Sequence, residues 1–164
     1  MILAPDLDTY VPISVGTASI TRSAEQSNDP TYRLFAGAHQ DFGVLALAPT
    51  MRKLEELRGW EDDWDGFRSA RPSEASIDRA IAVLPDLYRA ATQEGHAWIN
   101  PHVTASESGE VVLEWWSVNH KITLYVGADT LHYMRVWGLD VERDMDDSEL
   151  EIAGFNALWQ WLDA

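Results

Sequence analysis

Residues 110–137 read EVVLEWWSVNHKITLYVGADTLHYMRVW, and this stretch decides the fold class. Apolar side chains recur there at every second position, as they do in strands with one buried face; they are Val111, Leu113, Trp115, Ile122, Leu124 and Val126. Short turn-type segments at 108–109, 118–119 and 127–129 bound these runs. With a weaker strand near 98–104, the pattern predicts an antiparallel meander of three to five strands.

Helical patterns flank this meander on both sides. Thr50 is expected to cap a short helix over 50–59, and Ser73 a second helix in which Pro85 should introduce a kink or a break. After an acidic loop at 140–147, Ser148 is expected to cap a terminal amphipathic helix. The predicted fold is therefore α+β, an antiparallel β-meander with helices packed on one face.

The N-terminal part of the chain is harder to interpret. Residues 1–48 carry scattered prolines and a polar stretch, and short apolar runs at 10–15 and 42–47 are expected to be edge strands. We therefore predict an irregular N-terminal extension with short strands over 1–48, followed by a single α+β domain over 49–164.

Charge restricts the kinds of partner. Twenty-seven Asp and Glu face twelve Lys and Arg, for a formal net charge of −15, and the acids concentrate at 61–65 and 140–151. Such a surface repels nucleic acid and anionic membranes and attracts basic proteins, although an acidic surface can also serve solubility alone. There is no Cys, which excludes disulfides and thiolate zinc sites. Without a signal-peptide pattern or a long apolar run, we expect a cytoplasmic protein.

Several spaced motifs resemble a pattern in small bacterial and prophage proteins. The motifs are Trp60-x3-Trp64-Asp65-Gly66-Phe67, Ala70-x-Pro72 before a helix, Pro101-x-Val103, and Gly109-x-Val111-x-Leu113-Glu114-Trp115, within residues 54–137. The resemblance implies that the Trp-Asp-Gly-aromatic turn precedes a helix and that the Leu-Glu-Trp strand lies in a sheet. Arg68 departs from the pattern, because a small residue is common there. No activity is implied.

Two sets of residues are candidates for a metal site. Residues 61–66 resemble the start of a calcium loop, with acids at loop positions 1, 3 and 5 and Gly66 at position 6, but Pro72 replaces the Glu needed at position 12. The alternative is a turn shaped by Asp65-Gly66, anchored by aromatic residues, with acids that are solvated or paired with nearby arginines. Among the histidines, His102, His120 and His132 converge with Glu114 only if their strands are adjacent.

No other motif indicates catalysis. Gly-x-Ser-x-Gly elbows, P-loops and Gly-x-Gly-x-x-Gly fingerprints are all missing from the sequence. We therefore assign no catalytic residue, no metal ligand and no cofactor. The alternative, a metal-dependent hydrolase using the acidic loop or the strand histidines, stays open.

The leading hypothesis is a non-enzymatic acidic interaction protein. It would bind and inhibit a protein partner by contacting a basic surface of that partner, of the type that binds nucleic acid. Antitoxins, nuclease inhibitors and phage anti-defence proteins such as anti-CRISPR proteins act in this way. Trp115 is expected in the core, and its neighbour Trp116 on the other face. The predicted contact residues are Asp62, Asp63, Asp65, Asp144, Asp146, Asp147, Trp116 and Trp161. A third hypothesis is an assembly subunit that forms a homo-oligomer.

Overall fold

The computed structural model describes residues 30–93, 95–140 and 143–164, with side chains from Gly43 onward. Its element order is α1 (Pro30–Leu57), α2 (Glu74–Thr92), β1 (His102–Ala105), β2 (Val111–Trp116), β3 (Lys121–Val126), β4 (Leu131–Val136), β5 (Met145–Glu149), the 3₁₀ turn η1 (Ile152–Gly154) and α3 (Phe155–Leu162). No helix in the described part of the chain has the length and apolar character to cross a bilayer.

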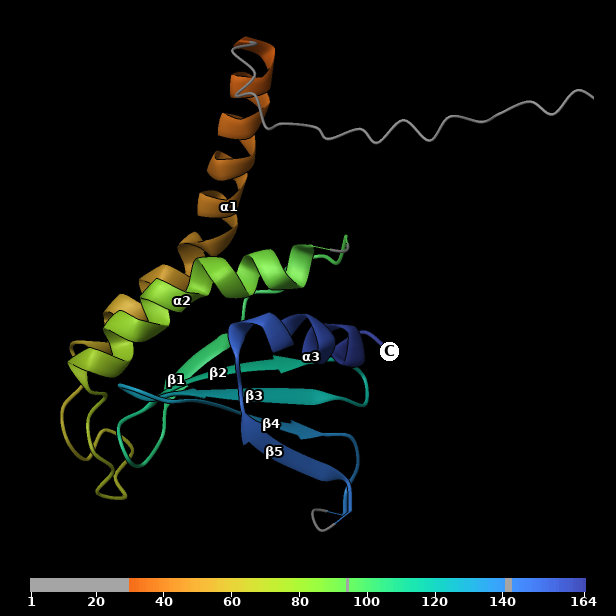
Figure 1. The fold of residues 1–164 in the computed structure, drawn as a ribbon. Helices are drawn as coiled ribbons and strands as arrows, with labels where there is room; N and C mark the ends of the chain where they lie inside the picture. The colour runs from red at the N-terminus through yellow and green to blue at the C-terminus, as the bar shows by residue number, and fades with distance from the viewer. Residues whose placement is uncertain (1–29, 94, 141–142) are drawn as a thin grey trace, which may run out of the picture.

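The five strands form one antiparallel sheet in the order β1-β2-β3-β4-β5, each strand pairing with the next along the chain. α2 and α3 pack on one face of this sheet and α1 packs against α2 and β1 (Figure 1). The predicted α+β class, the meander and the one-sided helical layer are confirmed.

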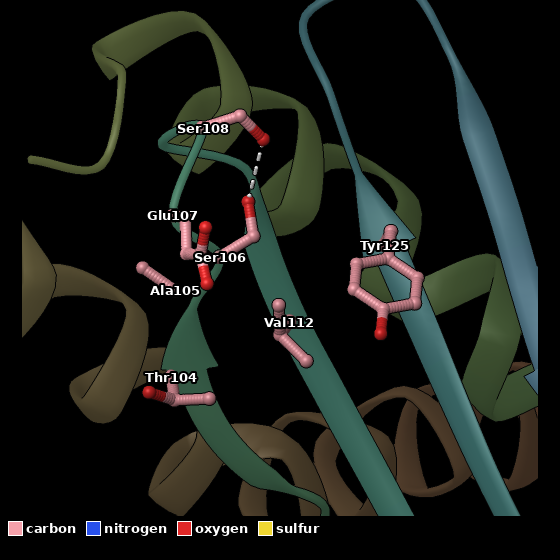
Figure 2. A pocket seen from close by; sticks show the side chains of 7 residues that line it. All are labelled: Thr104, Ala105, Ser106, Glu107, Ser108, Val112 and Tyr125. Carbon is pink, nitrogen blue, oxygen red and sulfur yellow. Dashed lines mark hydrogen bonds between the residues drawn. The ribbon is translucent and has the colours of Figure 1, made fainter. Parts of the chain in front are cut away.

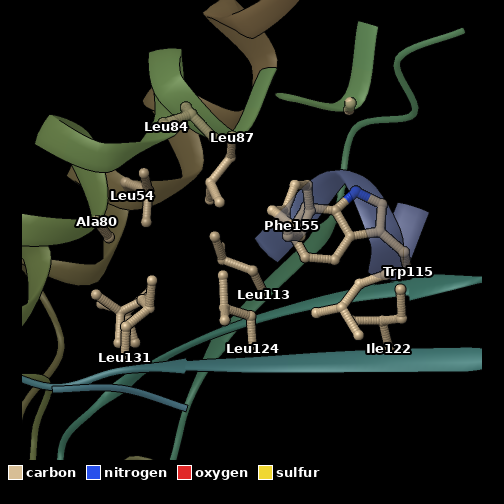
Figure 3. Close-up of a cluster of buried hydrophobic side chains, with 14 of the residues drawn as sticks. Leu54, Ala80, Leu84, Leu87, Leu113, Trp115, Ile122, Leu124, Leu131 and Phe155 are labelled. Atoms are coloured by element: carbon tan, nitrogen blue, oxygen red, sulfur yellow. The ribbon is translucent and has the colours of Figure 1, made fainter. Parts of the chain in front are cut away.

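The core lies between the sheet and the helices (Figure 3). Val111, Leu113 and Trp115 of β2 and the matching residues of β3 point into it, as the alternation predicts. Trp98 stacks on Trp159 of α3, with ring centroids 5.4 Å apart and an interplanar angle of 7°. Trp98, Trp115 and Trp159 therefore pack in or against the core.

Two expectations about the N-terminal half are wrong. Residues 42–47 are helical rather than a strand, because α1 starts at Pro30 and runs across the position where an extension was predicted to end. Thr50 lies inside α1, where its hydroxyl donates to Asn100 Oδ1 over 2.8 Å instead of capping a helix. Leu47, Leu54 and Leu57 are buried at helical spacing, which explains the helical packing of the last part of α1. The expected strand at 10–15 lies outside the described residues, and the domain division at residue 48 stays a prediction.

The second helix begins as its sequence predicts. The Ser73 hydroxyl accepts a hydrogen bond from the Ser76 amide over 3.0 Å, which satisfies one of the free donors at the start of α2. α2 continues through Pro85 without splitting, so the expected break is not present.

A further correction concerns the acidic stretch before the last helix. The sequence predicts loop and a helix cap over 145–149, but these residues form β5 on the edge of the sheet, with Ser148 opposite Tyr133. The terminal helix therefore starts later, at Phe155. β5 has the sequence MDDSE, which has no alternating apolar face, so hydrophobic periodicity does not reveal its strand character.

Candidate protein-interaction surface

The face of the sheet opposite the helices is called here the outer face. Strand register places on it His102, Thr104, Val112, Glu114, Trp116, Lys121, Thr123, Tyr125, His132, Met134, Val136, Met145, Asp147 and Glu149. No helix of the described residues covers this face (Figure 1). The outer face is therefore a surface on which a partner can contact the sheet directly, although Val112 and Thr123 are buried there.

Trp116 is the exposed aromatic residue at one end of this face. It is 50% exposed, whereas its neighbour Trp115 is 1% exposed on the core side, as the alternation predicts. Lys121 Nζ lies 5.5 Å from the Trp116 ring centroid, and the His102 ring lies 5.8 Å away. Glu114 pairs with Lys121 over 2.6 Å. The surroundings of Trp116 are thus a balanced charge cluster.

Two hollows lie on the other part of the face, one on each side of Tyr125. The first, of about 520 Å³, runs past Val112 to the β1–β2 turn (Figure 2). In that turn the hydroxyls of Ser106 and Ser108 lie 2.9 Å apart and donate to Glu110 Oε2 over 3.2 and 3.0 Å. These contacts order the turn and hold the Glu110 carboxylate in place.

The second hollow, called here the β5 hollow, has a volume of about 460 Å³. Its lining includes Glu110, Tyr125, His132, Met134, Met145 and Asp147. Tyr125 and the two methionines supply apolar surface, and Glu110 and Asp147 supply carboxylates. No Lys or Arg belongs to this lining. The β5 hollow therefore combines an apolar floor with negative charge.

The predicted contact residues at β5 have different environments. Asp147 is exposed on the outer face opposite Met134, and no ion pair of its carboxylate occurs among the described residues. Asp146, on the helix side of the sheet, instead accepts a hydrogen bond from Nε of Arg135 over 3.0 Å. Asp144 accepts the Asp140 amide over 3.1 Å in the β4–β5 turn. Of the three, Asp147 alone makes no side-chain hydrogen bond or ion pair within the described part of the chain.

Trp161 lies on the helix side, away from Trp116. Its ring contacts His120 at a centroid distance of 4.3 Å and Trp137 at 6.1 Å, and the Arg135 guanidinium lies 5.5 Å from its centroid. The structure therefore separates the two predicted tryptophan anchors onto opposite faces of the sheet.

The acids of the 61–65 segment shape their own loop. Asp62 Oδ1 accepts the Arg71 amide over 2.9 Å, and Asp63 Oδ1 accepts the Arg68 amide over 2.7 Å. Asp65 accepts both the Phe67 amide, over 2.9 Å, and the Ser69 hydroxyl, over 2.7 Å. These bonds support the turn alternative, with the carboxylates binding backbone amides rather than arginine side chains.

Hydrogen bonding lowers the pKa of one carboxyl group in this loop, that of Asp65. The bond from the Ser69 hydroxyl, followed by the one from the Phe67 amide, lowers the pKa of Asp65 below its ordinary value of 3.8. The loop tip leaves Phe67 86% exposed, so this ring does not anchor the turn, while Trp60 and Trp64 contact each other at 4.5 Å.

The loop and the β4–β5 turn lie at opposite ends of the sheet. Ala70 and Ser73 donate backbone hydrogen bonds to Glu107 and Gly109 of the β1–β2 turn, whereas Asp144 adjoins the strand end that carries Trp116. The two acidic clusters are therefore not one contact surface.

The three candidate histidines are not brought together, although His102 Nδ1 lies 3.4 Å from Glu114 Oε2. His102 and His132 lie on β1 and β4, with two strands between them, and His120 packs on Trp161. Within residues 30–93, 95–140 and 143–164, no group of three or more His, Asp or Glu is arranged to hold a metal ion. The hydrolase alternative stays a prediction.

Comparison with known proteins adds no assignment, since no family model, curated protein or solved structure matches this chain.

Sequence reasoning missed Glu110, Met145 and Glu149 as parts of the candidate surface. Met145 and Glu149 lie in a polar segment without an alternating apolar face, and Glu110 directly precedes β2. Because the sequence predicts loop where β5 lies, the side on which each of its residues points could not be predicted.

Proposed function

We propose that this protein is a non-enzymatic interaction protein that binds a basic protein partner on its outer face and thereby inhibits that partner. The observation that carries this proposal is the β5 hollow, where the carboxylates of Glu110 and Asp147 adjoin the apolar side chains of Tyr125, Met134 and Met145. A Lys or Arg side chain packs its methylene stem on apolar surface while its charged end binds carboxylate. The hollow therefore suits a basic side chain.

Two further properties of the chain support the proposal. The net charge of −15 speeds the encounter with a positively charged surface. Trp116 is half exposed on the same face and can supply the aromatic anchor that interfaces commonly contain. A partner that spans the sheet from β2 to β5 would contact both.

Inhibition follows from the kind of surface that such a partner must have. Basic patches on proteins commonly bind nucleic-acid phosphates, and most of that affinity is electrostatic. An acidic protein that occupies the patch excludes the nucleic acid. We therefore expect the partner to be a nucleic-acid-binding protein that loses this binding in the complex.

The experiment is affinity capture from a lysate of the source cells at low and moderate salt, with three forms of the protein. The first is the wild type, and the second carries Asp147→Asn and Glu149→Gln. The third carries Glu56→Gln and Asp86→Asn on α1 and α2, which remove the same charge from the helix side. We expect a basic protein with the wild type and the third form, reduced capture by the second, and weaker capture as salt rises.

The captured protein is then purified and its nucleic-acid binding is measured with and without added acidic protein. Loss of nucleic-acid binding with the wild type, but not with the outer-face variant, would support the proposal. Equal capture by all three forms, or a partner whose nucleic-acid binding is unaffected, would contradict it.

A further inference from the structure

We infer that β5 recognises its partner by strand addition, taking up an extended segment whose basic side chains stand at alternate positions; this inference rests on the proposed function. It specifies the part of the outer face that makes the contact and the conformation of the partner.

The free edge of the sheet is at β5. Among the described residues β5 pairs only with β4, and β4 is the only element with which it makes extensive contact. The opposite edge strand, β1, packs against α1. In Figure 1, β5 lies at the side of the sheet away from the helices. A strand edge of this kind presents unpaired N–H and C=O groups to other chains.

Hydrogen bonds to β4 show which backbone groups of β5 face outward. The Leu150 amide donates to the Leu131 carbonyl over 2.7 Å, and the Trp137 amide donates to the Asp144 carbonyl over 3.0 Å. Because bonded and non-bonded pairs alternate in an antiparallel ladder, Asp146 and Ser148 also bond to β4. The N–H and C=O groups of Met145, Asp147 and Glu149 therefore point to the free edge.

The same register decides which charged side chains β5 presents beside its free edge. Asp147 and Glu149 are exposed with side chains on the outer face, and neither carboxylate forms an ion pair within the described part of the chain. Residues two apart on a strand are about 7 Å apart on the same face. In an added strand, the residues opposite Asp147 and Glu149 lie on that face too, so Lys or Arg at these alternate positions form two cross-strand pairs.

Other occupants fit the edge less well. A second copy of β5 would place carboxylates against carboxylates, and like charges directly opposite each other are destabilising. A helix uses its own backbone groups internally and cannot pair with those of Met145, Asp147 and Glu149. A basic extended segment satisfies both the free backbone groups and the free charges.

The β5 hollow lies where a long basic side chain from the added strand can reach. Neighbouring strands are about 4.8 Å apart, so the added strand lies one strand spacing beyond Asp147. A Lys or Arg stem that crosses β5 there meets Met145 and Met134, with the Glu110 carboxylate beyond them. The backbone of the added strand and its basic side chain are therefore bound at the same place.

The test uses the full chain and synthetic peptides as probes. One peptide alternates Lys with Val, and a second has the same composition in a Lys-Lys-Val-Val repeat, in which residues two apart are never both Lys. Two further versions of the alternating peptide carry backbone N-methyl groups, either on the residues whose N–H would face β5 or on those whose N–H would face away. Affinities are measured by fluorescence anisotropy at fixed salt, and amide hydrogen exchange is followed at Met145, Asp147 and Glu149.

We expect the alternating peptide to bind roughly tenfold more tightly than the Lys-Lys-Val-Val peptide, because only the alternating arrangement places both cations opposite the carboxylates. N-methylation on the β5-facing side should weaken binding by about tenfold or more, since each buried hydrogen bond that is lost weakens it by a factor of several. N-methylation on the other side should have little effect. The three amides should exchange rapidly in the free protein and slowly with the peptide.

Two variants separate the charge from the backbone contribution. Asp147→Asn removes a charge, and Asp147→Pro also removes an N–H that is not bonded to β4, so both should fold and the proline variant should bind more weakly. Equal affinity for both peptide arrangements with no effect of N-methylation overturns strand addition, and the proposed function survives if Asp147→Asn still weakens capture. Protected edge amides in the free protein also overturn it, because the edge is then already paired. If neither the peptides nor the captured partner responds to Asp147→Asn and Glu149→Gln, both proposals fail.

Discussion

Arg135 and Asp146 pair across β4 and β5, with Nε donating to Oδ2 over 3.0 Å and Nη2 lying 2.9 Å from the same oxygen. The same guanidinium lies 5.5 Å from the Trp161 ring centroid and 5.8 Å from that of Trp137. This arrangement ties the edge strand to α3 on the helix side of the sheet. It also explains why Asp146 stabilises the fold while its neighbour Asp147 is available to a partner.

Replacing Arg135 by alanine should therefore destabilise the protein. We expect a loss of about 1 kcal/mol in the free energy of unfolding, because a partly exposed ion pair and a cation–π contact each contribute up to about that amount. Urea denaturation followed by tryptophan fluorescence measures this loss. Arg143→Ala is the matched control, because Arg143 pairs with Asp140 over 2.7 Å in an exposed turn and its removal should have less effect. Equal losses would contradict the role given to Arg135.

The adjacent residues Trp115 and Trp116 should differ sharply in their effect on stability. Trp115→Ala should cost about 3–5 kcal/mol, because the ring is buried among Trp98, Phe155 and Trp159. Trp116→Ala should change the free energy of unfolding by less than about 1 kcal/mol, since its ring is half exposed. Thermal and chemical denaturation give both values. If Trp115→Ala does not fold, Trp115→Phe should still be destabilised more than Trp116→Phe, and the reverse order would show that the assigned faces are wrong.

Gly109 is required by both its conformation and its surroundings. Its φ is +81°, and a Cβ there would lie 2.6 Å from the Arg71 carbonyl oxygen. Gly95 has a similar φ of +89°, but a Cβ at that position would meet no atom within 4 Å. We expect Gly95→Ala to cost about 1–2 kcal/mol from backbone strain alone. Gly109→Ala should cost more, because the clash displaces the segment before α2; equal losses in urea denaturation would argue against such a contact.

The loop around Asp65 should make stability depend on pH at the acid end. Its hydrogen bonds to Ser69 and Phe67 lower the pKa of Asp65, so the folded state favours the carboxylate. This stabilisation is complete above the ordinary pKa of 3.8 and is lost as the pH falls through the lower pKa of the folded state. Ser69→Ala should raise the pKa of Asp65 in an NMR titration of its carboxyl carbon.

Asp65→Asn provides the control for this effect. The difference in stability between wild type and Asp65→Asn should shrink as the pH is lowered below about 4, because the wild-type carboxylate then becomes protonated. A difference that stays constant down to the lowest pH at which the protein folds would contradict the assignment.

Much of the fold could be predicted because its signals are local. Ser73 caps α2 with a hydroxyl only three residues from the amide it binds, so the motif is visible in the sequence. The faces of β2 and β3 follow from alternation, since a strand with one buried face must repeat its apolar residues at every second position. The loop at 61–65 is similarly recognisable as a turn through Asp65-Gly66, whose geometry depends on nearby residues.

The sequence by itself determined α2, the central strands and the acidic character of the surface. Only the tertiary structure decided that 145–149 is a strand. This segment has no apolar face to bury, and its backbone pairs with that of β4. It also decided the different environments of Asp146 and Asp147. These neighbours have the same side chain, but alternation directs one to Arg135 and the other to the free outer face, and that direction follows from the register with β4.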